Sequence, residues 1–203
     1  MLAVDPFVAI LVDAFWLDPW LATLAPADHG RRRALTVFFR AIVRYSHRHA
    51  GVTTSADASA IACWLPPEHP AIKTWGLVKQ GIWRLPLALG RRRMSQFLAQ
   101  VEFVDRLRAC LQPSPHYYLT LLAVSPRVQG TGVGGRLLES VLQQSDERSL
   151  PCYLETFNPR NVPFYARHGF EVIEEAESTV PGVRAWAMRH MPAKHIDQSV
   201  QDA

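Results

Sequence analysis

Residues His116 to Leu138 have the sequence HYYLTLLAVSPRVQGTGVGGRLL, in which an apolar run is followed by a cluster of glycines. The run Tyr117–Val124 predicts a strand buried on both faces of a sheet. Pro126 ends this strand, because proline has no N–H to donate to a neighbour. A helix is predicted next, over 134–144, and the glycines at its start are Gly130, Gly132, Gly134 and Gly135. A strand, a glycine turn and a helix direct free N–H groups and the helix dipole at an anion, typically a phosphate.

Length and composition are those of one globular domain. The chain has 203 residues, of which 48% are hydrophobic and 20% charged, and this is enough to bury a full core. No apolar run reaches about 18 residues, the length of a membrane span. Asp5 and Asp13 lie in the N-terminal segment, which has no basic leader. We therefore expect neither a signal peptide nor a membrane partner.

The cysteines and the charges narrow the function classes further. Cys63, Cys110 and Cys152 lie at wide spacings, which indicates reduced thiols in a cytoplasmic protein and no structural metal site. The net charge is +4, and Arg31–Arg33 and Arg91–Arg93 are basic runs. Both runs fall in predicted helices without interleaved aromatic residues, which argues against nucleic acid as a partner. The mild positive charge equally suits a polyanionic cofactor.

The chain before the glycine stretch predicts helices and one hairpin. A usual opening strand would have to lie in the short segment Met1–Val4. The elements that follow are a helix over 6–15, an aromatic loop at Trp16–Trp20, a helix from its N-cap Asp28 to His49, and a hairpin of Val52–Ser55 with Ala60–Leu65. Residues 70–112 predict an inserted amphipathic helix in two pieces divided near Pro86, with a basic elbow at Arg91–Arg93. Its apolar residues either pack in the core or form the wall of a substrate cavity.

The chain after the glycine stretch returns to the sheet. Pro151–Phe157 predicts a second strand, which the strand–helix–strand order makes parallel to the first. A short helix and a closing hairpin follow, at Val162–His168 and at Phe170–Glu177 with Arg184–His190. We expect a single domain over residues 1–191 and a disordered tail over 192–203.

Two interpretations of the glycines were compared. Gly130–Gly135 satisfies the dinucleotide pattern G-x-G-x-x-G, and Glu155 follows about 20 residues later, where a ribose-binding acid would lie. In that pattern, however, the first glycine comes at the end of the strand, whereas Ser125–Gln129 intervene here. Too few residues remain to complete a six-stranded dinucleotide fold, so this interpretation is disfavoured.

The second interpretation uses the intervening residues. Arg127–Gly132 (RVQGTG) resembles R/Q-x-x-G-x-G/A, the acetyl-CoA signature of the GNAT family of N-acetyltransferases. The phrase Leu122–Pro126 and the segment Asn158–Phe170, with its Asn, Tyr165 and Gly-Phe, also resemble that family. The resemblance covers about residues 116 to 190. It implies an α/β fold with a mostly antiparallel central sheet, one splayed parallel strand pair and flanking helices.

The resemblance further implies direct transfer of an acetyl group from acetyl-CoA to a primary amine in a ternary complex. Backbone N–H groups of Val128–Gly135 and the helix N-terminus would bind the diphosphate, and an N–H of Leu122 or Val124 would stabilise the thioester oxyanion. The residues expected to bind the cofactor are Leu122, Ala123, Val124, Arg127, Val128, Gln129, Gly130, Thr131, Gly132, Val133, Gly134, Gly135, Asn158, Asn161 and Tyr165.

The candidate catalytic residues are Tyr165 and Glu155. Tyr165 lies at the position of the family's tyrosine, and a phenol with a pKa of about 10 can protonate the leaving thiolate. Asn158 fits the pantetheine-contacting asparagine, and Asn161 is either a second contact or only a helix cap. Glu155 is the favoured general base. Tyr118 stands where some family members carry a carboxylate, and a lone histidine at a strand start, like His116, is usually a surface residue.

The acceptor is expected to be a small molecule or a peptide amine. Its pocket should draw on Trp16, Trp20, Trp64–Pro66 and the inserted helices, whose apolar character favours an uncharged or aromatic acceptor over a polycation. The alternative is a non-catalytic acyl-CoA-binding module, followed by a nucleic-acid-binding protein. The oligomeric state is expected to be monomer or homodimer.

Overall fold

A computed structural model of the chain describes residues 3–24, 29–69, 71–112 and 114–192. Its helices are α1 (Val4–Ala14), α2 (Pro19–Leu24), α3 (His29–Arg48), α4 (Thr74–Lys79), α5 (Leu85–Leu111), α6 (Val133–Glu147) and α7 (Val162–Ala166), with short 3-10 helices η1 (Ile82–Arg84), η2 (Pro126–Val128) and η3 (Pro159–Asn161). Its strands are β1 (Val52–Thr54), β2 (Ala60–Leu65), β3 (Tyr117–Val124), β4 (Cys152–Thr156), β5 (Phe170–Glu177) and β6 (Arg184–His190).

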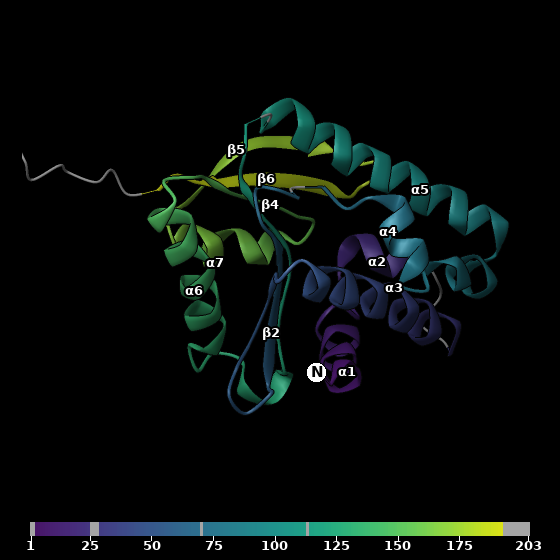
Figure 1. Cartoon of the computed structure of the whole chain (residues 1–203). Helices are drawn as coiled ribbons and strands as arrows, with labels where there is room; N and C mark the ends of the chain where they lie inside the picture. Colours follow the sequence, from purple (N-terminus) through teal and green to yellow (C-terminus); the bar gives the residue numbers. More distant parts are fainter. Residues whose placement is uncertain (1–2, 25–28, 70, 113, 193–203) are drawn as a thin grey trace, which may run out of the picture.

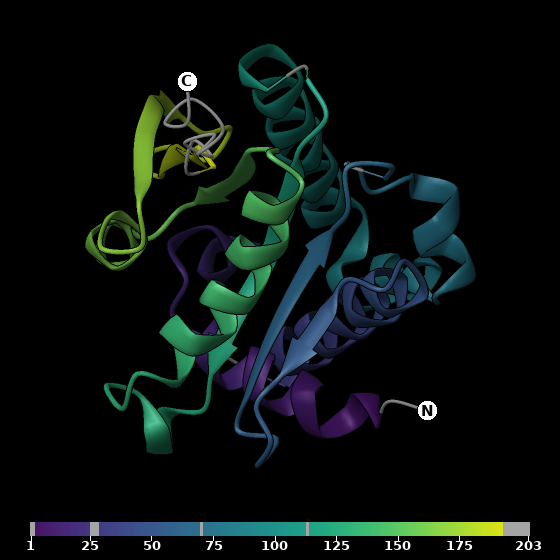
Figure 2. The ribbon, with the colours of Figure 1, turned by 60° about the vertical axis from the view of Figure 1, so that its left-hand side comes forward.

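The strands form one six-stranded sheet in the order β1-β2-β3-β4-β6-β5. Helices α6 and α7 cover one face, and α1 to α5 lie on the other (Figure 1). Seen from another side, α6 crosses the sheet between the β1–β2 hairpin and the β5–β6 hairpin (Figure 2). The mixed α/β fold with flanking helices is therefore confirmed.

The β3–β4 pair is the only parallel pair among the described strands. Its register contains Tyr117 opposite Cys152 and Tyr118 opposite Tyr153, and no further pair. Beyond Tyr118 the two strands therefore diverge, which leaves this edge of β3 with backbone groups that β4 does not use. The predicted splayed pair is present.

A β-bulge on β3 changes which side chains face which layer. The register with β2 shifts between Cys63 and Trp64, so that Leu121 pairs with Cys63 and Leu119 pairs with Trp64. The intervening Thr120 donates its hydroxyl to the Cys63 carbonyl over 2.8 Å. Leu119 packs against α6, whereas Leu121 packs with α1, α3 and α5. Bulges reorient side chains beside functional sites. This one turns Leu122 and Val124 toward the glycine loop, which is the segment Gly130–Gly135.

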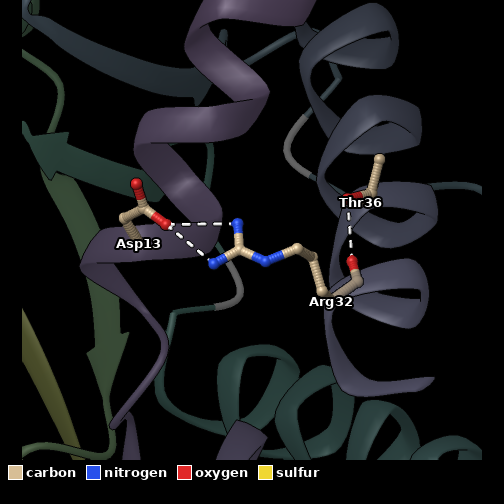
Figure 3. A network of polar contacts seen from close by, with 3 residues as sticks. All are labelled: Asp13, Arg32 and Thr36. Atoms are coloured by element: carbon tan, nitrogen blue, oxygen red, sulfur yellow. Dashed lines mark hydrogen bonds and ion pairs between the residues drawn. The ribbon is translucent and has the colours of Figure 1, made fainter. Parts of the chain in front are cut away.

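The basic run at the start of α3 makes contacts within the chain. Arg31 is buried and donates to the Trp16 carbonyl over 3.1 Å and to the Ala22 carbonyl over 2.5 Å. Arg32 forms an ion pair with Asp13 of α1 at 3.3 Å, and Thr36 donates to the Arg32 carbonyl over 2.7 Å (Figure 3). The Arg32 and Asp13 side chains are 57% and 51% exposed, so this pair contributes at most about 1 kcal/mol. The α1–α3 contact therefore depends mainly on apolar packing.

The inserted helices divide close to the predicted places. A new helix, α5, begins at Leu85 after the 3-10 turn η1, and Pro86 lies in its first turn, where no backbone N–H is needed. A kink follows at Gly90, with φ 74° and ψ 168°, directly before the predicted elbow at Arg91–Arg93.

The N-terminal predictions have mixed outcomes. The predicted aromatic loop ends earlier than expected, because α2 begins at Pro19 and Asp18 accepts hydrogen bonds from the Trp20 and Leu21 N–H groups. Val4 already belongs to α1 rather than to an opening strand. Met1, Leu2, the predicted cap Asp28 and the tail from 193 on lie outside the described residues. No helix in the described part of the chain is long and apolar enough to cross a membrane.

Candidate active site

The glycine loop forms one wall of a cleft of about 1170 Å³. Gly132 is the N-cap of α6 with φ 81°, a conformation that favours glycine. A Cβ on Gly134 would lie 3.1 Å from Cγ2 of Val124, so the start of α6 packs closely on β3. The first N–H groups of a helix have no intrahelical partner, and those of α6 are available to an anion in the cleft.

Most of the predicted cofactor residues line this cleft. They are Leu122, Ala123, Val124, Val128, Gln129, Gly130, Gly132, Val133, Gly134, Gly135, Asn158, Asn161 and Tyr165. Arg127 and Thr131 are exposed and do not line it. Four basic residues that were not predicted also line the cleft, namely Arg136, Arg160, Arg167 and His168. Their proximity in sequence to the two motifs was the signal that could have identified them.

A second cavity of about 330 Å³ lies between the splayed strands, the α1–α2 turn and the helices α2 to α5. Residues from β3, β4 and the inserted segment, which contains α4, η1 and α5, line this cavity. The cavity and the cleft share five lining residues: Phe15, Asp18, Leu122, Asn161 and Tyr165. The two spaces therefore meet where β3 diverges from β4.

Tyr165 lies at this junction. Its side chain is buried, and its ring packs edge-on against Phe170, with the ring centroids 5.7 Å apart. Burial raises the pKa of the Tyr165 phenol above its ordinary value. The phenol is therefore protonated at neutral pH and can donate a proton toward either space.

Glu155 extends from β4 into the second cavity. The residue is half-buried, and its Oε1 is shielded from solvent without a hydrogen-bond partner among the described residues. Burial raises the pKa of Glu155 to about 7, while the Arg108 guanidinium and the hydroxyls of Tyr118 and Tyr153 act in the opposite direction. A carboxylate with a pKa near neutrality is suited to exchanging protons.

Arg108 of α5 is a member of this cavity that the sequence argument did not identify. It is buried, with Nη2 2.7 Å from Oδ1 of Asp105 and its guanidinium 4.6 Å from the ring centroid of Tyr118. Its Nη1 has no partner among the described residues. No motif marks an arginine that reaches the site from an inserted helix, so only the packing of α5 reveals it.

His116 differs from the sequence expectation, because it is buried rather than at the surface. Its Nδ1 lies 2.7 Å from the Ser114 carbonyl, and since a carbonyl only accepts, Nδ1 carries the proton. Burial lowers the pKa of His116. The residue does not line either cavity, whereas Tyr118 lines the second one.

The two asparagines have different surroundings. Asn158 accepts a hydrogen bond from the Arg160 N–H over 3.1 Å and lines the cleft alone. Asn161 donates from Nδ2 to the Thr156 hydroxyl over 3.1 Å, makes no side-chain cap of α7, and lines both spaces. The possibility that Asn161 is only a helix cap is therefore not supported.

Of the tryptophans expected around the acceptor, only Trp20 lines the second cavity. The Trp16 ring instead lies under Arg31 and Arg32, at 5.1 and 5.2 Å from their guanidinium carbons. Trp64 packs against Tyr117 on the opposite face of the sheet. The described residues contain no group of three or more His, Cys, Asp or Glu side chains that could hold a metal ion.

Comparison with known proteins finds similarity to acetyltransferases. Residues 101–191 match the family described as Acetyltransferase (GNAT) domain. An uncharacterized N-acetyltransferase of Schizosaccharomyces pombe is 29% identical over 169 residues, which cover 80% of this chain and 68% of that protein. A probable serine/threonine-protein kinase of Dictyostelium discoideum is 30% identical over 153 residues, which cover 62% of this chain and 21% of that protein.

A crystal structure from Corynebacterium glutamicum, described as histone acetyltransferase HPA2 and related acetyltransferase, has the same fold. Its TM-score is 0.66 at 25% identity, over 94% of this chain and 91% of that one. Residues 101–191 thus resemble the GNAT acetyltransferase domain, and the chain as a whole has the fold of an acetyltransferase structure.

Proposed function

We propose that the protein transfers an acetyl group from acetyl-CoA to a primary amine. The observation that carries this proposal is the meeting of the two spaces at Leu122 and Tyr165. One space has the glycine loop and suits a nucleotide diphosphate, and the other contains a carboxylate whose pKa lies near 7. A thioester held in the first space would be exposed to an amine held in the second.

The residues of the cleft fit acetyl-CoA. The start of α6 offers N–H groups to the diphosphate, and Arg136, Arg160 and Arg167 line the same cleft and add positive charge. The part of β3 beyond Tyr118 has backbone groups that β4 leaves free for the pantetheine amides. The bound molecule supplies the acetyl thioester.

The chain's own groups then account for each proton. Glu155 takes a proton from the ammonium of the acceptor, so that the amine nitrogen can attack the thioester carbonyl. A backbone N–H of Leu122 or Val124 donates to the developing oxyanion. As the C–S bond breaks, Tyr165 gives its proton to the leaving thiolate, which becomes the CoA thiol. The attacking nitrogen loses its second proton to the Tyr165 phenolate, which restores the phenol and leaves the amide, with one net proton on Glu155. Asn158 and Asn161 orient the pantetheine arm from the opposite side of the cleft.

The proposal is tested by measuring cofactor binding and turnover separately. Calorimetry with acetyl-CoA, CoA and NAD should show binding of the first two and none of NAD. Release of free thiol across a panel of amines should then identify an acceptor. Binding of acetyl-CoA without thiol release from any amine would favour the non-catalytic acyl-CoA-binding module instead.

Three further predictions stand beside this function. We propose that the enzyme acts in the cytoplasm, where Cys63, Cys110 and Cys152 remain reduced, and all three are free thiols in the structure. We also propose a single catalytic domain over residues 1–191. Size-exclusion chromatography with light scattering tests the predicted monomer or homodimer.

A further inference from the structure

The second cavity has an extended apolar part. Its volume of about 330 Å³ equals that of about ten water molecules, which matches a compact organic molecule rather than a folded peptide. The apolar part is formed by α3 and by the inserted segment, which contains α4, η1 and α5. Its lining includes Phe38, Ile42, Leu77, Ile82, Met94 and Phe97.

Charged groups occupy only a small part of this lining. Among the described residues they are Asp18, Asp105, Arg108 and Glu155. Asp18 accepts two backbone hydrogen bonds at the start of α2, and Asp105 pairs with Arg108 at 2.7 Å. Glu155 Oε1 is the one carboxylate oxygen here that is buried without a partner. The cavity therefore offers Glu155 Oε1, beside the Arg108 guanidinium, as an acidic partner to a single amino group.

From this arrangement we infer that the acceptor is a primary monoamine with an apolar tail of aromatic size, whose nitrogen lies at Glu155 and whose tail fills the apolar part. This inference rests on the proposed acetyl transfer. A second ammonium, as in a polyamine, would be buried among apolar side chains without a counter-ion, which is costly. A carboxylate on the acceptor would find one cationic side chain in the described lining, Arg108, and this guanidinium already pairs with Asp105 through Nη2.

The mouth of the cavity can be located from its exposed lining residues. Trp83 of η1 is 55% exposed and Leu98 of α5 is 51% exposed, and both line the cavity. Leu87 of α5 is 73% exposed and lines neither space. Leu98 and Leu87 therefore form a matched pair for substitution, since both are exposed leucines of the same helix.

The first experiment compares acceptors in the full-length protein. Acetyl-CoA binding is measured by calorimetry, and thiol release is measured with tryptamine, 2-phenylethylamine, spermidine, L-phenylalanine and a lysine-containing peptide. We expect kcat/KM for tryptamine or 2-phenylethylamine to exceed that for the other three by at least about tenfold, the scale of discrimination by an apolar pocket. Preference for spermidine, L-phenylalanine or the peptide would overturn this inference and leave acetyl transfer intact. Absence of acetyl-CoA binding or of all thiol release would instead overturn the proposed function and this inference with it.

The second experiment alters the mouth. Leu98→Glu places a carboxylate beside the apolar part and should raise the spermidine-to-tryptamine ratio of kcat/KM by about tenfold, whereas Leu87→Glu should leave it unchanged. Calorimetric titration of tryptamine into CoA-saturated protein adds a readout without turnover, and Leu98→Glu should weaken this binding. An unchanged ratio and unchanged tryptamine affinity in Leu98→Glu would show that the cavity does not hold the acceptor.

Discussion

The cleft and the second cavity are built in opposite ways. The cleft is lined mainly by two continuous segments, 122–136 and 158–168, and its glycine loop offers main-chain groups. The cavity takes its lining from the α1–α2 turn, α2, α3, the inserted helices, β3 and β4, and presents side chains. A site that uses the backbone leaves a local pattern of glycines in the sequence, because the chain must approach its ligand closely. A site assembled from distant side chains leaves no such pattern.

The largest effect should come from a substitution in the glycine loop, where the cleft presents backbone N–H groups. Gly132→Asp places a side chain at a residue with φ 81° and brings a carboxylate toward the diphosphate position. We expect CoA affinity to fall by at least about 100-fold, or about 2.7 kcal/mol. Calorimetry with CoA measures the loss. Gly182→Asp is the control, because Gly182 has φ 76° and open space around it in the β5–β6 turn. Equal affinities in the two variants would show that the loop is not the diphosphate site.

The second-largest effect should come from a substitution at Glu155, which lines the second cavity and not the cleft. Glu155→Gln keeps the shape of the residue but removes its basic group, so kcat/KM should fall by about 100-fold with CoA affinity unchanged. Because Glu155 must be ionised to take a proton, wild-type kcat/KM should rise with pH through about 7 and then level off. The variant should lack that inflection. A pH–rate profile of both proteins makes the measurement, and an inflection retained in the variant would assign the base to another group.

These two regions also differ in how far the sequence could predict them. The strand, the glycine turn and α6 were predictable because apolar periodicity and glycine placement act over neighbouring residues. Glu155 was predicted from its place on the second strand, yet its raised pKa depends on burial by α5. The position of Arg108 in the cavity depends on how α5 packs. The absence of Trp64 from the cavity depends on the sheet face to which β2 directs that side chain. Neither is a local property of the sequence. The break before α5 and the bend at Gly90 were predictable to within a few residues, because Pro86 marks the first turn of a helix and the predicted elbow at Arg91–Arg93 lies next to Gly90.

A smaller effect is expected at the junction of the two spaces. Tyr165→Phe removes the proton donor but keeps the buried ring, and it should lower kcat by roughly tenfold, because a thiol with a pKa near 8.5 needs limited help in leaving. Affinity for acetyl-CoA should stay the same. Single-turnover rates and calorimetry separate the two quantities. A reduced affinity with an unaltered rate would make Tyr165 a packing residue of the cleft and not an acid.

The smallest effect is on stability, and it tests the burial of Glu155 without any substrate. The folded protein holds the Glu155 proton more tightly than the unfolded chain, since the pKa rises from 4.5 to about 7. Its contribution to stability is therefore present at low pH and is lost as the pH rises from about 4.5 to 7. Glu155→Gln removes this dependence, so Tm of the variant relative to wild type should be higher at pH 7.5 than at pH 6 by about 2–5 °C, the equivalent of about 1.2 kcal/mol. Glu174→Gln, at an exposed position on β5, should show no such difference. If thermal unfolding gives the same relative Tm at both pH values for Glu155→Gln, then Glu155 is not a buried acid with a raised pKa. The second cavity would then lack the titrating side chain that distinguishes it from the cleft, which presents backbone groups.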